Sequence, residues 1–128
     1  MEKNESENNS SPVCNLNYLS ELMGGKTHLI KKIMDTFLIQ VPEELKSINR
    51  ATTIVDYSTI KNLAHTMKSS VSIMGISVLQ PILQEMEDLG TKETGSDSYR
   101  IEKIIALNTQ LNLICNQAFK EIKNHSFS

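Results

Sequence analysis

The residue types best suited to chemistry in this chain gather around His65. Lys61 precedes it by four residues and Lys68 follows it by three, so on a helix both ammonium groups lie beside the imidazole. Two neighbouring cations disfavour a protonated ring, and a neutral ring has a nucleophilic nitrogen. The same cations stabilise a dianionic phosphoryl group once it is attached. The pattern favours a histidine that accepts phosphate.

Two small hydroxylated residues share this face with His65. Ser69 follows the histidine by four residues and Ser72 by seven, which places both on the same side of a helix. Small side chains around a reactive ring allow another protein to approach it closely. Taken alone, either neighbouring lysine is more typical of an ordinary solvated charge, so the prediction depends on the whole cluster.

The segment that carries these residues has the spacing of an amphipathic helix. Asp56 is a suitable N-cap, and Gly75 is a suitable stop. The apolar residues fall within an arc about 100° wide, and they are Ile60, Leu63, Ala64, Met67, Val71 and Met74. His65 lies roughly 150° from the centre of that arc. We therefore expect its ring to face water and not the core.

Two further helices are predicted before this one. The first covers residues 16–23, with Asn15 as its cap and two glycines after it. The second begins near Lys26, and Pro42 either kinks it or begins a new helix. Its apolar stripe is formed by Ile30, Ile33, Met34, Phe37, Leu38, Val41, Leu45, Ile48 and Ala51.

Two helices are predicted after it. Ser77 can cap the first, with Pro81 in its first turn and a stripe of Leu79, Leu83, Met86 and Leu89. Residues 90–98 are expected to be a loop, and the last helix covers residues 99–122. Its inward residues are Ile101, Ile104, Ile105, Leu111, Ile114, Ala118 and Ile122. With no strand pattern, the expected fold is all-α, a four-helix bundle with a short additional N-terminal helix.

Composition supports one helical domain and excludes several classes. The chain has 128 residues, 5% aromatic residues, five Gly and three Pro, which argues against an all-β sandwich or barrel. Residues 1–12 are polar and are predicted to be a disordered tail or linker remnant. The domain is expected over residues 13–123, with a C-terminal tail at 124–128.

Charge and hydropathy bear on partners and location. The net charge of −2 gives no basic excess for nucleic acid. No apolar run reaches the roughly 20 residues of a membrane span, and the start of the chain lacks the apolar region of a signal peptide. Cys14 and Cys115 have no metal-ligand spacing with the histidines. A reducing, cytoplasmic location is expected.

The run AHTMKSSVSIMG at residues 64–75 resembles the phosphorylation motif of histidine-containing phosphotransfer (HPt) domains. That motif has a His, a Lys three residues later, a small residue directly after the Lys, and a Gly ten residues after the His. His65, Lys68, Ser69 and Gly75 match it in order. The runs LNYLSELMGG, FLIQVPEELKSI and GISVLQPILQEMEDL resemble the family too, and the resemblance extends over residues 15–122. Within the family, the chain resembles the modules found at the C-terminus of bacterial hybrid sensor histidine kinases.

The resemblance implies a phosphorelay intermediate. His65 would accept a phosphoryl group from a receiver-domain aspartate and pass it to another receiver. Lys68 would steady the phosphoryl charge, Ser69 would leave room for the receiver, and Gly75 would permit close packing of the next helix. Mg²⁺ is expected on the receiver, so no metal or other cofactor is expected on this chain. A monomeric phosphocarrier without an ATP site is expected, and not an enzyme, working with response-regulator receivers and a hybrid sensor histidine kinase.

The sequence departs from the family pattern at two positions. Members often have Gly where this chain has Ser69, although a small residue is kept. Members often place an amide on the next helix near the imidazole, where this chain has Glu87. A carboxylate can orient the ring, but its charge would oppose a phosphoryl group. Glu87 is therefore the weakest of the site candidates.

Two other functions stay open at this point. The fold can serve as an adaptor that binds and modulates a receiver without being phosphorylated. The dimerisation domain of a histidine kinase is disfavoured, because such domains have an acid and usually a proline soon after the histidine, and Thr66 and Met67 stand here. Ile73 is a candidate for an apolar docking rim around His65. His28 and His125 are expected to be ordinary surface residues.

Overall fold

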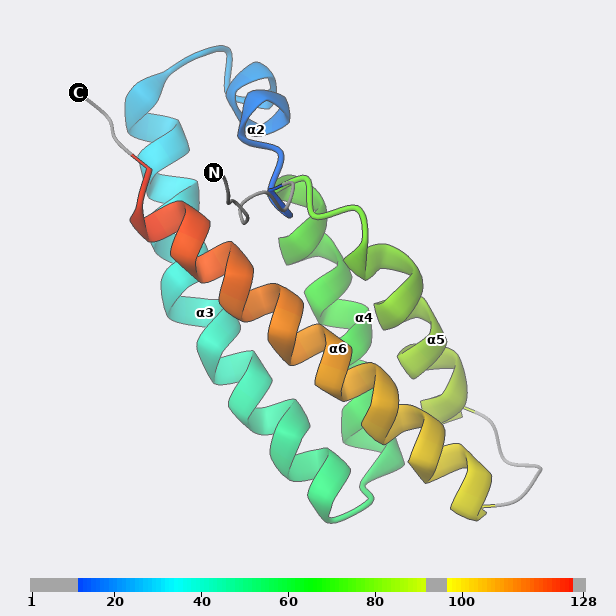
Figure 1. The fold of residues 1–128 in the computed structure, drawn as a ribbon. Coiled ribbons are helices and arrows are strands. Elements are labelled where there is room, and N and C mark those ends of the chain that lie inside the picture. The colour runs from blue at the N-terminus through cyan, green and yellow to red at the C-terminus, as the bar shows by residue number, and fades with distance from the viewer. Residues whose placement is uncertain (1–11, 92–96, 126–128) are drawn as a thin grey trace, which may run out of the picture.

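The chain folds into a bundle of helices (Figure 1). The computed structural model describes residues 12–91 and 97–125, and this part of the chain contains helices and no strand. The helices are α2 (Leu16–Leu22), α3 (Thr27–Thr53), α4 (Tyr57–Ile73), α5 (Leu79–Thr91) and α6 (Asp97–Lys123). The predicted all-α bundle with a short N-terminal helix is confirmed.

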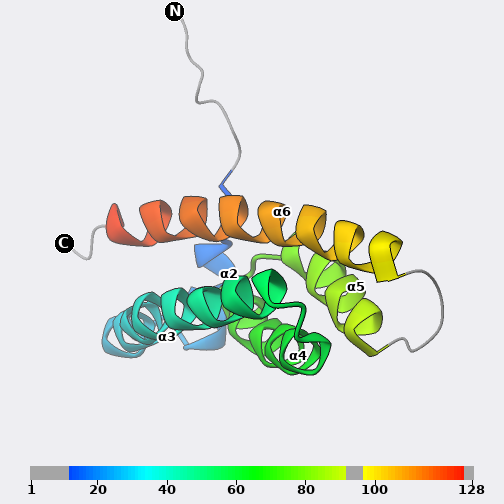
Figure 2. The same ribbon diagram turned by 90° about the horizontal axis from the view of Figure 1, so that it is seen from below.

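The four long helices pack in an antiparallel arrangement. Helix α4 lies between α3 and α5, and α6 runs along the opposite side of the bundle, where it covers both α3 and α5 (Figure 2). The short α2 packs near the start of α3. Within the described ranges, no helix combines the length and the apolar character that crossing a membrane requires.

The ends of the helices follow their capping residues. The Asn15 side chain accepts a hydrogen bond from the Tyr18 amide and so caps α2. Gly24 and Gly25, with φ of 62° and 72°, turn the chain into α3. Helix α3 continues through Pro42 as one helix, which settles the two alternatives that the sequence left open: no new helix begins there.

The predicted loop at residues 90–98 is wrong at both ends. Helix α5 continues through Gly90 and Thr91, and α6 already begins at Asp97; residues 92–96 lie outside the described part of the chain. Gly90 was expected in the loop, but it is buried within the last turn of α5. Tertiary packing outweighs its weak helix propensity at this position.

The predicted apolar stripes form one core between the helices. Its largest fully buried side chains are Leu19, Met34, Ile48, Ile60, Met67, Met74, Ile76, Leu79, Leu83, Met86, Ile104 and Leu111. Ile105 is a correction, because its side chain is 49% exposed. Successive helical residues differ by about 100°, and Ile104, Leu107 and Leu111 already occupy the inward face of α6.

A network of asparagine side chains joins α3 to α6. Asn49 Oδ1 accepts hydrogen bonds from Asn108 Nδ2 (2.8 Å) and Asn112 Nδ2 (2.9 Å). Asn49 Nδ2 in turn donates to Asn112 Oδ1 (3.0 Å). These neutral amides are partly buried, so their pairing specifies how the two helices align.

The segment before α2 is tied to α6 by one carboxylate. Glu121 accepts hydrogen bonds from the Val13 amide (2.8 Å) and the Cys14 amide (2.9 Å). Cys14 and Cys115 are both free and buried, and burial raises the pKa of each thiol to about 12.

Candidate functional site

Helix α4 presents His65 to solvent, as its apolar periodicity predicts. The Asp56 side chain accepts a hydrogen bond from the Thr59 amide (3.2 Å) and from the Thr59 hydroxyl (2.6 Å), and so caps the helix. These bonds lower the pKa of Asp56. With its apolar face buried against the bundle, α4 leaves the His65 side chain 69% exposed.

The His65 ring is oriented by a carboxylate on the next helix. Its Nδ1 lies 3.0 Å from Glu87 Oε2. Because an ionised carboxylate only accepts hydrogen bonds, a neutral ring in this position carries its proton on Nδ1. The lone pair is then on Nε2, which makes no hydrogen bond to any of the residues described. Glu87, the weakest candidate from the sequence, is thus in direct contact with His65.

Lys68 neutralises the carboxylate that holds the ring. Its Nζ lies 2.7 Å from Glu87 Oε1 and 2.8 Å from Gln84 Oε1, and the side chains of Lys68 and Glu87 are only 22% and 21% exposed. The contact with Lys68, followed by that with His65, lowers the pKa of Glu87. The carboxylate is therefore ionised at neutral pH. The Lys68 ammonium group offsets its negative charge, which would otherwise oppose a phosphoryl group on His65.

Two glutamines of this site were not among the residues predicted from the sequence. Gln84 accepts from Lys68 and donates through Nε2 to Asp88 Oδ1 (2.9 Å). Gln80 Nε2 donates to the Lys68 carbonyl (3.1 Å). Together with Glu87 they form a polar stripe with helical spacing on α5. This stripe is the feature of the sequence that could have indicated them. It is informative only once α5 is known to lie against the His65 face.

The other predicted residues lie around the ring in different settings. Lys61 is half-buried and its side-chain stem lies against Gly90 of α5, while Ser69 and Ser72 are exposed on α4. Ile73, the candidate for an apolar docking rim, is not fully exposed. It is partly buried and lines a hollow between α3 and α4, together with Ser69.

Gly75 is required by the backbone conformation and by a close neighbour. Its φ is +67°, and a Cβ added there would lie 2.6 Å from Asn15 Cβ. The Asn15 amide donates to the Met74 carbonyl (3.0 Å). The closest approach at Gly75 is therefore to the segment before α2.

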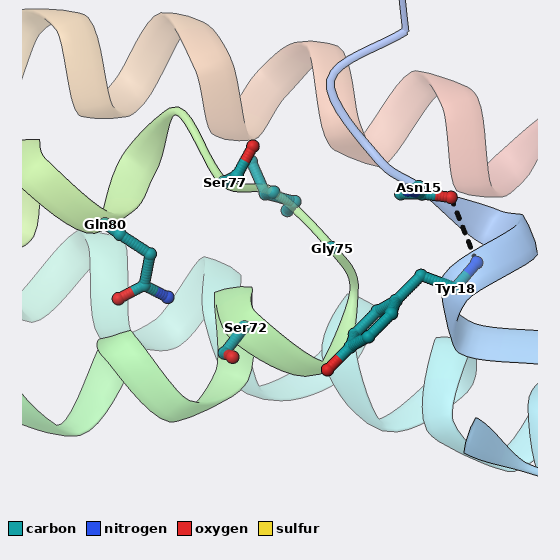
Figure 3. Close-up of a pocket in the computed structure, with 7 residues that line it drawn as sticks. Asn15, Tyr18, Ser72, Gly75, Ser77 and Gln80 are labelled. Atoms are coloured by element: carbon teal, nitrogen blue, oxygen red, sulfur yellow. Dashed lines mark hydrogen bonds between the residues drawn. The ribbon is translucent and has the colours of Figure 1, made fainter. Parts of the chain in front are cut away.

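A hollow of about 270 Å³ adjoins this turn (Figure 3). Ser72 and Gln80 line its wall from α4 and α5, and Tyr18 lines it from α2. Ser72 lies two helical turns from His65 on the same face. The hollow where α2, α4 and α5 meet is thus continuous with the exposed face of α4 that carries His65.

The remaining histidines take no part in this site. His28 is exposed on α3, and His125 is exposed beyond the end of α6. Across residues 12–91 and 97–125, no three His, Cys, Asp or Glu side chains gather into a group that would hold a metal ion.

A comparison with models of protein families gives a match. The model of the Hpt domain matches residues 32–117, which include His65 and its partners on α5. The chain belongs to the Hpt domain family. Hpt domains are phosphocarriers of two-component signalling that have no kinase activity of their own and interact with response-regulator receivers. Searches of curated proteins and of solved structures give no match.

Proposed function

We propose that this Hpt domain is a phosphorelay intermediate whose phosphoacceptor is His65. It takes a phosphoryl group from the aspartate of one receiver and passes it to the aspartate of another. The observation that carries the proposal is the pairing of His65 Nδ1 with Glu87 at 3.0 Å on an exposed face, because it leaves Nε2 as the nucleophile.

The groups at the site account for each bond and charge that changes in the transfer step. Nε2 attacks the phosphorus of the receiver's aspartyl phosphate, the N–P bond forms, and the bond from phosphorus to the aspartate oxygen breaks. The aspartate leaves as a carboxylate. The imidazole keeps its proton on Nδ1 and becomes positively charged, and the ionised Glu87 stabilises that charge across the 3.0 Å contact. Transfer to the second receiver reverses these events.

Two lysines are placed to offset the phosphoryl dianion. Lys68 uses two of its three donors on Glu87 and Gln84, which leaves one for a phosphoryl oxygen. Lys61 lies one turn before His65 and forms no ion pair with the acidic side chains in the described ranges. Since little covalent chemistry is needed, positioning and charge stabilisation account for most of the catalysis.

The partners follow from this role. We expect the donor to be a receiver within a hybrid sensor histidine kinase, and the Mg²⁺ used in transfer to be bound by the receiver. One exposed histidine needs no second copy of the domain, so we expect a monomer, which light scattering measures.

Phosphoryl transfer from a labelled receiver tests the proposal. Wild type should take up label that is lost in mild acid, and His65→Gln should take up none. His28→Gln is the matched control, because it removes another exposed histidine, and it should be labelled as wild type is. If folded wild type binds phosphorylated receivers but takes no label from any of a panel of them, the domain is a non-phosphorylated adaptor.

A further inference from the structure

Helix α5 approaches α4 unusually closely at Gly90. A Cβ added to this glycine would lie 3.0 Å from Lys61 Cβ and 3.0 Å from the Tyr57 carbonyl oxygen, with Lys61 Cα at 3.1 Å. Such distances are shorter than ordinary van der Waals contact between carbon atoms. A side chain at this position would therefore require Lys61 or the Tyr57 carbonyl of α4 to give way by a few tenths of an ångström.

The close approach lies one helical turn from the His65 ring. Lys61 precedes His65 by four residues, and Glu87 precedes Gly90 by three. Helices α4 and α5 run antiparallel. Two contacts therefore follow one another along the interface between them, that of Gly90 with Lys61 and that of Glu87 with His65. A helix moves as a stiff unit over one turn, so a displacement at Gly90 moves Glu87.

Arg100 of α6 holds this end of α5 in place. Its Nε donates to the Leu89 carbonyl (2.7 Å) and its Nη2 donates to the Gly90 carbonyl (3.2 Å). Its guanidinium lies 3.6 Å above the centre of the Tyr57 ring. The arginine thus joins the last turn of α5 to the first turn of α4, on the side where Gly90 makes its close approach.

We propose that Gly90 is a positioning residue for His65. By having no side chain, it sets the spacing between α4 and α5 that keeps Glu87 Oε2 at Nδ1. This contact holds the neutral ring in the Nδ1–H tautomer, which leaves Nε2 free to react. The consequence for phosphoryl transfer rests on the function proposed above, whereas the consequence for the tautomer does not.

A merely structural role predicts something different for an alanine at this position. Alanine is a better helix former than glycine, so a change that affected only the helix would leave the tautomer of His65 unaltered. A change in the spacing of α4 and α5 breaks the hydrogen bond to Glu87. Neutral histidine then returns to the Nε2–H tautomer that it favours in water.

The test compares Gly90→Ala with wild type in the complete chain. Nitrogen-15 NMR of the His65 ring should show a shift of the neutral form from Nδ1–H towards Nε2–H. The rate of phosphoryl transfer from a phosphorylated receiver should fall about tenfold, as expected for a displacement smaller than 1 Å. Thr91→Ser is the matched control, because it changes the exposed neighbour in the same turn but keeps the hydroxyl that donates to the Glu87 carbonyl (2.9 Å), and both readouts should match wild type.

An unchanged tautomer in folded Gly90→Ala overturns the proposal. If that variant does not fold, Arg100→Lys decides, because it loosens the end of α5 without adding volume at Gly90. The tautomer should shift in the same direction, and an unchanged tautomer again overturns the proposal. A tautomer shift in a domain whose wild type takes no label supports the positioning by Gly90 and overturns the proposed phosphotransfer instead.

Discussion

Two pairs of antiparallel helices in this domain are joined by polar side chains of different kinds. Between α3 and α6, neutral amides bond to one another, with both atoms of the Asn49 amide group in use. Between α4 and α5, charged groups form a chain from Lys68 through Glu87 to His65. The amide network is partly buried, whereas the charged chain ends on an exposed ring with Nε2 open.

The difference indicates what each network contributes. A partly buried amide that loses its partner costs free energy of unfolding, so the Asn49 network stabilises the fold. Ion pairs near the surface contribute little stability. The charged chain instead sets the ionisation of Glu87 and the tautomer of His65, on which the proposed phosphoryl transfer depends. Mutations in the two regions should therefore separate stability from phosphoryl transfer.

The largest effect on stability is expected at the turn after α4. This turn packs against the segment before α2, and Glu121 of α6 holds that segment. Gly75→Ala should lower the free energy of unfolding by about 3 kcal/mol, from its positive φ and from overpacking against Asn15. Gly24→Ala is the control, because Gly24 has a similar φ and nothing within 4 Å. It should cost only about 1 kcal/mol. Equal losses in urea unfolding would show that the contact with Asn15 is unimportant.

The next effect concerns reactivity alone. Glu87→Ala should slow phosphoryl transfer about 100-fold, because the partner that orients the ring is lost. Glu87→Gln keeps an acceptor for Nδ1 and should slow transfer by about tenfold or less. Transfer rates from a phosphorylated receiver measure this, with thermal unfolding as the check on folding. A Glu87→Ala domain that transfers as fast as wild type would remove the carboxylate from the mechanism.

The opposite behaviour is expected between α3 and α6. Asn49→Ala should lower the free energy of unfolding by about 2 kcal/mol, because the amides of Asn108 and Asn112 lose their shared partner. Its rate of phosphoryl transfer should equal that of wild type. Thr53→Ala, one turn further along α3 and exposed, should cost less than about 0.5 kcal/mol. A slower transfer by folded Asn49→Ala would contradict the separation of the two regions.

The smallest effect is a dependence of stability on pH. The pKa of Glu87 is lowered from 4.5 in the folded domain, so its contribution to stability is complete above that value. The contribution is lost as the pH falls through the folded-state pKa. It should amount to well under about 1 kcal/mol, measured as the difference between wild type and Glu87→Gln in urea unfolding. If the difference in the free energy of unfolding between wild type and Glu87→Gln grew on acidification, the expected direction of the pH dependence would be wrong.

Much of the fold was predictable because its signals are local. Apolar spacing located the helices, and Asn15 and Asp56 located two of their starts within a residue. The errors have a tertiary origin. Gly90 was expected in the loop at residues 90–98, but it lies within α5, where a Cβ would lie only 3.0 Å from Lys61 Cβ.

The sequence by itself determined that His65 faces solvent between two cations, because one helix and its periodicity decide that. Only the tertiary structure decided that Glu87, 22 residues further along the chain, binds Nδ1 and that Lys68 neutralises it. The reason is that the distance between α4 and α5 is a property of packing and not of either helix. Spacing along the chain indicates which face a residue occupies, but not what lies across from it.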